Sequence, residues 1–179
     1  MSSPTPPSFI HLQVHSEYSL LDGTVRIKPL IKAAVQAGMP AVAITDQNNL
    51  FSMVKFYRAA IAEGVKPIIG VDLWVEDDLL TGYVGRITLL CQNRTGYRNL
   101  SVLVSKAYLS GQAGGQPQIK QSWLTDQSEG LIALSGGLEG LVGKSLTSNN
   151  SEQCANILSS WKTLFPERFY LQIQRTGRP

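Results

Sequence analysis

Six short apolar runs recur along the chain, and stretches with helical spacing of their apolar residues separate most of them. We expect strands at 9–15, 41–45, 67–75, 87–91, 131–135 and 169–173. Apolar runs of this length that alternate with helices are typical of βα units around a parallel sheet or barrel. The pattern therefore predicts an α/β fold, because six strands are too many for a small α+β domain.

Four helices are expected between these strands, and a Gly- and Gln-rich exposed loop at 111–118. The helices cover roughly 29–38, 53–63, 97–109 and 151–165. Pro29 is suited to open the first helix, and Gly38 to end it. Ser151 is the expected N-cap of the fourth.

The length of 179 residues, with 43% hydrophobic residues, allows one well-packed core. We expect a disordered tail at 1–8 and a single domain at 9–179. No export signal or membrane-length apolar run is visible, and two isolated cysteines fit a reducing interior, so the sequence predicts a cytoplasmic protein without a membrane partner. A closed barrel of eight βα units takes about 250 residues, so we expect an incomplete barrel, truncated before its last units.

Both histidines of the chain lie in the first apolar run, where His11 and His15 flank Gln13. Side chains alternate between the faces of a strand, so these three are expected to line one polar face. Asp22 follows in an Asp-Gly turn that could fold back over that face. The pattern resembles a metal site, although glutamine binds metals far less well than histidine does.

Further polar residues follow or interrupt later runs, namely Asp46, Gln47, Asp72 and Thr176. Each alone is more often a turn former or a helix cap. Because βα folds place their chemistry at the C-terminal ends of strands, the joint placement of these residues predicts one site.

A competing motif is the Gly-rich stretch 136–145, which ends in Gly143-Lys144-Ser145. A phosphate-binding loop requires glycine at the position that Leu138 occupies, and Gly137 lies one residue too early. We interpret the stretch as a tight turn that enters a helix.

Five ordered blocks stand out along the chain, namely 15–23 (HSEYSLLDG), 38–46 (GMPAVAITD), 66–70 (KPIIG), 95–100 (TGYRNL) and 174–178 (QRTGR). Together they resemble the N-terminal polymerase and histidinol phosphatase (PHP) domain of bacterial DNA polymerase III alpha subunits. The resemblance implies a distorted seven-unit (β/α) barrel of the PHP type, incomplete here. It also implies a parent chain that is a magnesium-dependent DNA-directed DNA polymerase, a nucleotidyltransferase of DNA replication.

Active members of that family hold zinc or manganese ions at the strand ends for phosphodiester hydrolysis. The resemblance places ligand positions at Gln13, His15, Asp22, Gln47, Asp72 and Thr176. Active relatives carry histidine where this chain has Gln13, Gln47 and Thr176, and glutamate where it has Asp72. Only His15, Asp22 and Asp72 keep metal-binding chemistry. Three ligands cannot hold an ion cluster, so we expect a vestigial metal site, no catalytic residue and no cofactor in this part of the chain.

The resemblance leads to a first hypothesis of a catalytically silent scaffold that docks the proofreading exonuclease subunit and other replicase subunits, with DNA bound through the parent chain. The second hypothesis is an active metal-dependent phosphoesterase or 3'-5' exonuclease with substituted ligands. The third is a nucleotide-binding protein that uses 136–145.

Overall fold

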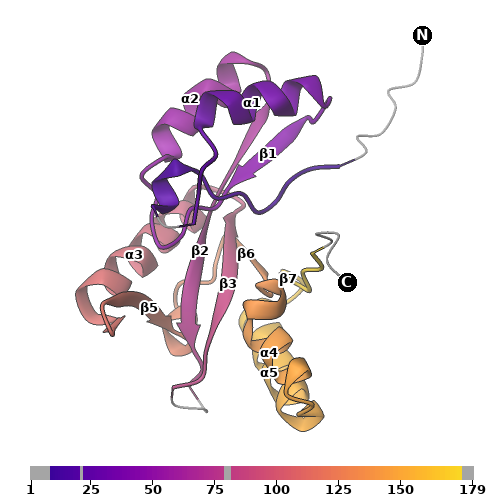
Figure 1. The fold of residues 1–179 in the computed structure, drawn as a ribbon. Coiled ribbons are helices and arrows are strands. Elements are labelled where there is room, and N and C mark those ends of the chain that lie inside the picture. The colour runs from indigo at the N-terminus through magenta and orange to yellow at the C-terminus, as the bar shows by residue number, and fades with distance from the viewer. Residues whose placement is uncertain (1–8, 21, 79–81, 175–179) are drawn as a thin grey trace. The chain divides into compact units, whose positions relative to one another are not determined.

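The computed structural model describes residues 9–20, 22–78 and 82–174. It divides into two compact units, Met1–Gly70 and Val71–Pro179. Figure 1 shows the helices and strands of both units. The expected tail at 1–8 lies outside the described residues.

Two helices and a pair of parallel strands form the first unit. Its elements are the 3-10 helix η1 (Glu17–Ser19), α1 (Ile27–Gln36), β1 (Ala41–Ile44), α2 (Met53–Ala62) and the first part of β2 (Lys66–Glu76). β1 pairs in parallel with β2, from Ala41 opposite Lys66 to Ile44 opposite Ile69. The core comprises Ile27, Ile31, Ala34, Val42, Ile44, Phe56, Ala60 and Val65.

Helix α1 begins two residues before the expected opening residue. Ile27, Ile31 and Ala34 recur at spacings of four and three, so they share the buried face of the helix. Pro29 is the third helical residue, a position whose backbone N–H would have no partner within the helix in any case. Gly38 follows the helix with φ of +66°, a left-handed conformation that suits glycine. The expected helix is therefore confirmed, with its start moved.

The expected strand at 9–15 is wrong, because these residues form no regular strand. Their backbone nevertheless runs beside β1. Ala43 N–H donates to the His11 carbonyl at 2.9 Å, and Thr45 N–H donates to the Val14 carbonyl at 2.9 Å. Between these two bonds the segment advances three residues, from His11 to Val14, whereas its partner advances two, from Ala43 to Thr45. One extra residue therefore interrupts the ladder of hydrogen bonds. Strict alternation of side chains is lost with it.

A mixed sheet forms the centre of the second unit, with strand order β4-β5-β2-β3-β6-β7. Its strands besides β2 are β3 (Val84–Cys91), β4 (Gln112–Ala113), β5 (Gln116–Lys120), β6 (Leu131–Leu134) and β7 (Phe169–Tyr170). β2–β5 and β6–β7 are parallel pairs, whereas β3–β6 is antiparallel. In the described residues the ends of this order, β4 and β7, are not paired with each other, so the sheet is open.

The helices of the second unit are α3 (Arg94–Ser110), α4 (Leu141–Thr147) and α5 (Ser151–Leu164), with 3-10 helices η2 (Gln121–Leu124) and η3 (Gly137–Glu139). Two expectations are corrected here. The predicted loop at 111–118 contains β4 and the first part of β5, which form an antiparallel pair. The N-cap of α5 is Asn150 rather than Ser151, because the Asn150 side chain accepts the Gln153 N–H at 3.0 Å.

None of the helices in the described ranges combines the length and the apolar character needed to span a bilayer.

Candidate functional site

His15 and Asp22 form a direct pair in the first unit, with 2.9 Å between His15 Nδ1 and Asp22 Oδ2. An ionised carboxylate only accepts hydrogen bonds, so the imidazole donates through Nδ1. The chain can turn back because Gly23 has no side chain: a Cβ there would lie 1.9 Å from the Ser16 carbonyl oxygen. The Glu17 N–H then donates to the Val25 carbonyl at 2.8 Å.

Asp46 is the most completely enclosed of the predicted site residues in the first unit, with 1% of its surface exposed. Its carboxylate accepts the Ser16 N–H at 2.6 Å and the Ser16 hydroxyl at 2.8 Å. The Ser19 hydroxyl donates to it at 2.9 Å, and the Ser52 hydroxyl makes a further short bond. Four donor groups of the protein therefore surround this carboxylate.

Sequence reasoning missed the three serines of this cluster. Ser16 is the N-cap of η1, Ser19 is its last residue, and Ser52 stands at the N-cap position of α2. Ser52 makes no side-chain capping bond to the helix, since its hydroxyl donates to Asp46 instead. The available signal was the presence of serines near a loop that follows a buried strand, which is too common a pattern to single them out.

The loop after β1 is held by the Gln47 backbone N–H and by the Asn49 side chain. Gln47 N–H donates to the Ser19 hydroxyl oxygen at 3.0 Å. The Asn49 side-chain amide donates to the carbonyls of Tyr18 and Gln47 at 3.0 and 2.9 Å. These bonds tie the loop to the turn that carries η1, so the cluster joins two segments that are distant in sequence.

The expected row of His11, Gln13 and His15 on one strand face is not formed, because the segment is no strand. His11 is exposed and packs edge-on against Phe9, with 4.8 Å between ring centroids. Gln13 is half-buried.

Asp72 lies within the second unit, on β2, and is fully buried. The Thr88 hydroxyl of the neighbouring strand β3 donates to its carboxylate in a short hydrogen bond. Thr176 lies outside the described residues. Within the described ranges, no three or more His, Cys, Asp or Glu side chains are grouped so that they could hold a metal ion.

The Gly-rich stretch forms η3 and α4, as the interpretation as a turn entering a helix predicts. Lys144 Nζ donates to the Val84 carbonyl at 2.6 Å and lies 5.7 Å from the centroid of the Trp74 ring. In a phosphate-binding loop this lysine would point at the nucleotide. Here Lys144 is hydrogen-bonded to the backbone of β3 instead.

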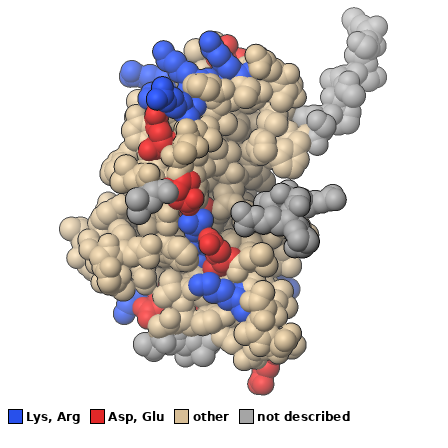
Figure 2. Space-filling view, in the orientation of Figure 1, with Lys and Arg blue, Asp and Glu red and all other residues tan. Residues whose placement is uncertain are grey.

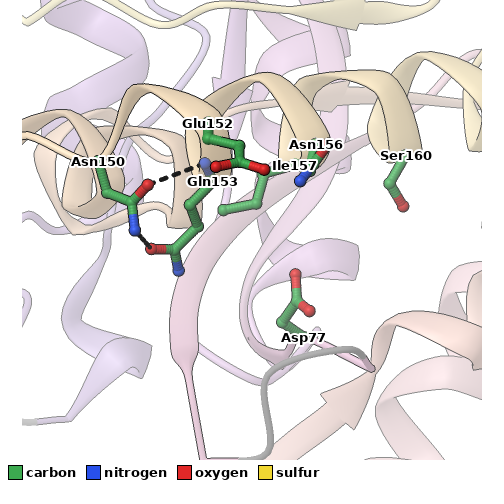
Figure 3. A pocket seen from close by; sticks show the side chains of 7 residues that line it. All are labelled: Asp77, Asn150, Glu152, Gln153, Asn156, Ile157 and Ser160. Carbon is green, nitrogen blue, oxygen red and sulfur yellow. Dashed lines mark hydrogen bonds between the residues drawn. The ribbon is translucent and has the colours of Figure 1, made fainter.

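A pocket of about 240 Å³ opens between Asp77 and the start of α5 (Figure 3). Asn150 and Gln153 on its rim are joined by two 3.0 Å hydrogen bonds. Its other lining residues are Glu152, Asn156, Ile157 and Ser160. None of the predicted site residues lines it, so this pocket is separate from the candidate site.

Comparison with known proteins decides the family. Residues 11–176 match the family model described as the PHP domain. The chain belongs to the PHP domain family. It is 49% identical over 174 residues to the DNA polymerase III subunit alpha of Pseudomonas fluorescens and 47% identical over 173 residues to that of Escherichia coli K12. Each match covers 97% of this chain and 15% of the relative, so the chain spans about 15% of the length of these relatives.

A solved structure supports the fold of this PHP domain. It is a Bifidobacterium adolescentis protein described as a metal-dependent phosphoesterase, with a TM-score of 0.59 and 11% sequence identity. The match covers 95% of this chain and 78% of that protein. The expected fold class, a distorted and incomplete PHP-type barrel, agrees with this neighbour and with the open sheet.

Proposed function

We propose that this PHP domain is part of a cytoplasmic bacterial replicase, as a region of a DNA polymerase III alpha subunit. The proposal rests on identities of 47–49% over nearly the whole chain. The parent chain would carry the magnesium-dependent polymerase chemistry and the contacts with DNA. The domain itself would act as a scaffold that docks the proofreading exonuclease subunit.

The observation that supports a catalytically silent scaffold is the chemistry of the ligand positions in the first unit. PHP domains are generally metal-dependent, and a metal centre needs carboxylate lone pairs directed at the ions. The neighbouring Asp46 carboxylate, which is not one of these ligand positions, accepts three hydroxyls and one backbone N–H. Gln13 and Gln47 are amides, which are weak ligands, and Asp22 is hydrogen-bonded to His15. In the first unit, a vestigial metal site at Gln13, His15, Asp22 and Gln47 accounts for this chemistry. The resemblance adds the positions of Asp72 and Thr176 in the second unit to the proposal.

Metal analysis of the dialysed protein tests the vestigial site. We expect less than one equivalent of zinc or manganese per chain, and no release of nucleotides from a labelled primer when manganese is added. Zinc or manganese held at one equivalent or more, together with activity that His15→Ala abolishes, would instead support the alternative of an active metal-dependent phosphoesterase or exonuclease.

The docking role has its own test, which is co-purification of the full-length polypeptide containing this chain with the proofreading exonuclease subunit. Failure of the two to associate would contradict the scaffold proposal whatever the metal content.

A further inference from the structure

The outer face of α2 carries apolar side chains that the described structure leaves in solvent. Val54, Tyr57 and Ile61 expose 53%, 50% and 55% of their surface, and Phe51 just before the helix exposes 68%. The opposite face of the helix is buried through Phe56 and Ala60. Surface apolar residues are normal singly, but a contiguous row on one helix face marks an interaction surface.

The spacing of this row matches one side of a helix. At about 100° per residue, Val54, Arg58 and Ile61 fall within roughly 60° of one another around the axis, and Phe51 and Tyr57 flank them. Positions at spacings of three and four are those through which one helix packs against another. The row is therefore shaped to receive an amphipathic helix, with Arg58 as a cation at its centre.

The charges of the two helices in this unit are of one sign. α1 carries Lys28 and Lys32, α2 carries Lys55 and Arg58, and neither helix contains an acidic residue. All four basic side chains are exposed. Figure 2 shows Lys and Arg gathered over the surface of α1 and α2. This surface is complementary to an acidic partner.

One basic side chain of this surface has an internal partner. Lys55 Nζ lies 3.1 Å from the Glu17 carboxylate, and this hydrogen bond raises the pKa of Lys55 above its ordinary value. Arg26, just before α1, lies 3.9 Å from the same carboxylate. Glu17 therefore offsets part of the charge on one side, whereas Arg58 lies among the apolar residues.

Nucleic acid is a poorer match to this face than a protein segment is. Binding to single strands combines several phosphate contacts with successive stacking platforms. The aliphatic residues Val54 and Ile61 occupy the centre of the face, and Arg58 is the cation between them. Branched aliphatic side chains pack against other apolar side chains rather than against phosphates.

We propose that the α2 face, defined as Phe51, Val54, Tyr57, Arg58 and Ile61, docks an acidic amphipathic segment of the exonuclease subunit. This inference rests on the proposed scaffold role and adds to it a surface and the chemistry of the partner. The apolar residues supply the buried contact, and the basic side chains of α1 and α2 orient the acidic face of the segment.

Binding of the purified exonuclease subunit to the full-length polypeptide containing this chain, followed by fluorescence anisotropy, tests the surface. We expect the double variant Val54→Lys/Ile61→Lys to weaken binding at least tenfold. Its matched control is Val102→Lys/Leu109→Lys on α3, where the exposed fractions are 49% and 85%. The control pair is expected to leave binding unchanged.

A charge-reversal variant separates the electrostatic part without adding bulk. We expect Arg58→Glu to weaken binding and reduce its dependence on ionic strength, whereas Arg98→Glu on the exposed side of α3 changes neither. Far-ultraviolet circular dichroism is expected to match the parent for every variant, since all the substituted side chains are exposed.

Unchanged binding in the α2 variants, or an equal loss in the α2 and α3 variants, would overturn the inference while leaving the scaffold role intact. Tight binding of single-stranded oligothymidylate that the α2 variants abolish, with exonuclease binding retained, would also overturn it. Absence of any association in the parent polypeptide contradicts the scaffold proposal itself.

Discussion

Replacing Asp46 by asparagine tests whether this carboxylate is a structural residue. The substitution keeps the size and shape of the side chain but removes its charge and turns one acceptor oxygen into a donor group. In the parent protein, four donor groups of Ser16, Ser19 and Ser52 form hydrogen bonds to the Asp46 carboxylate. All of these side chains are at least nine-tenths buried, so water cannot replace the lost acceptor.

The magnitude follows from the number of hydrogen bonds affected. A hydrogen bond to an ionised group contributes about 1.5–3 kcal/mol, whereas one between neutral groups contributes about 0.5–1.5 kcal/mol. Neutralising the acceptor of four donors therefore costs roughly 4–6 kcal/mol if the four bonds act independently, and coupling within the cluster reduces the sum. We expect a loss of about 3 kcal/mol in the free energy of unfolding, a large part of the 5–15 kcal/mol typical of domains.

Urea unfolding followed by circular dichroism measures this loss. For a chain of this length, about 3 kcal/mol corresponds to a fall in melting temperature of roughly 6–12 °C. Asp126→Asn provides the control, because Asp126 is exposed, and its effect is expected to stay within about 0.5 kcal/mol. Ser52→Ala is expected to cost about 2 kcal/mol, and the double variant less than the sum of the two.

An unchanged or increased stability of Asp46→Asn would refute the reasoning. Residues retained for catalysis are often kept at a cost to stability, so their neutralisation tends to stabilise a protein. The sign of the change therefore distinguishes a structural carboxylate from one held for chemistry.

Three further predictions concern two residues of the second unit, Cys91 and Gly96. Burial raises the pKa of the Cys91 thiol to about 12, so we expect negligible reaction with Ellman's reagent at pH 8 until the protein is unfolded. That folded-state pKa lies above the ordinary value of 9.0, so the stability that Cys91 contributes is present below pH 9 and decreases as the pH rises toward 12. Urea titrations of the parent and of Cys91→Ala across this pH range measure the decrease. Gly96→Ala is expected to destabilise the chain by about 3 kcal/mol, because its Cβ would lie 1.9 Å from the Gly130 carbonyl oxygen; a melting temperature equal to that of the parent would contradict this contact.

Buried strands and amphipathic helices were the most predictable parts of the fold. β1, β2, β3 and β6 lie where short apolar runs occur, since each run buries its side chains in a core. The pair β4–β5 was missed because Gly114 and Gly115 mark a turn in a stretch with little apolar content. Local composition did not reveal that this turn joins two short strands.

The candidate site was predictable only in part. The Asp-Gly turn at 22–23 correctly suggested a fold-back toward His15, because glycine permits the close approach. The alternation rule failed at 11–15, where one extra residue opposite β1 breaks the two-residue period. The role of Asp46 depends on serines from two segments that are distant in sequence, and contacts of that kind arise from tertiary packing.

The irregular backbone at 11–14 also protects the first unit against unwanted pairing. Ala43 and Thr45 of β1 already donate their N–H groups to this segment, so that side of the strand offers little to an incoming chain. The segment itself has no evenly spaced row of donors and acceptors, because its extra residue shifts the ladder. A regular strand at this place would have presented a template for intermolecular sheet growth. The same irregularity that removes the predicted row of side chains thus lowers the tendency of the unit to aggregate.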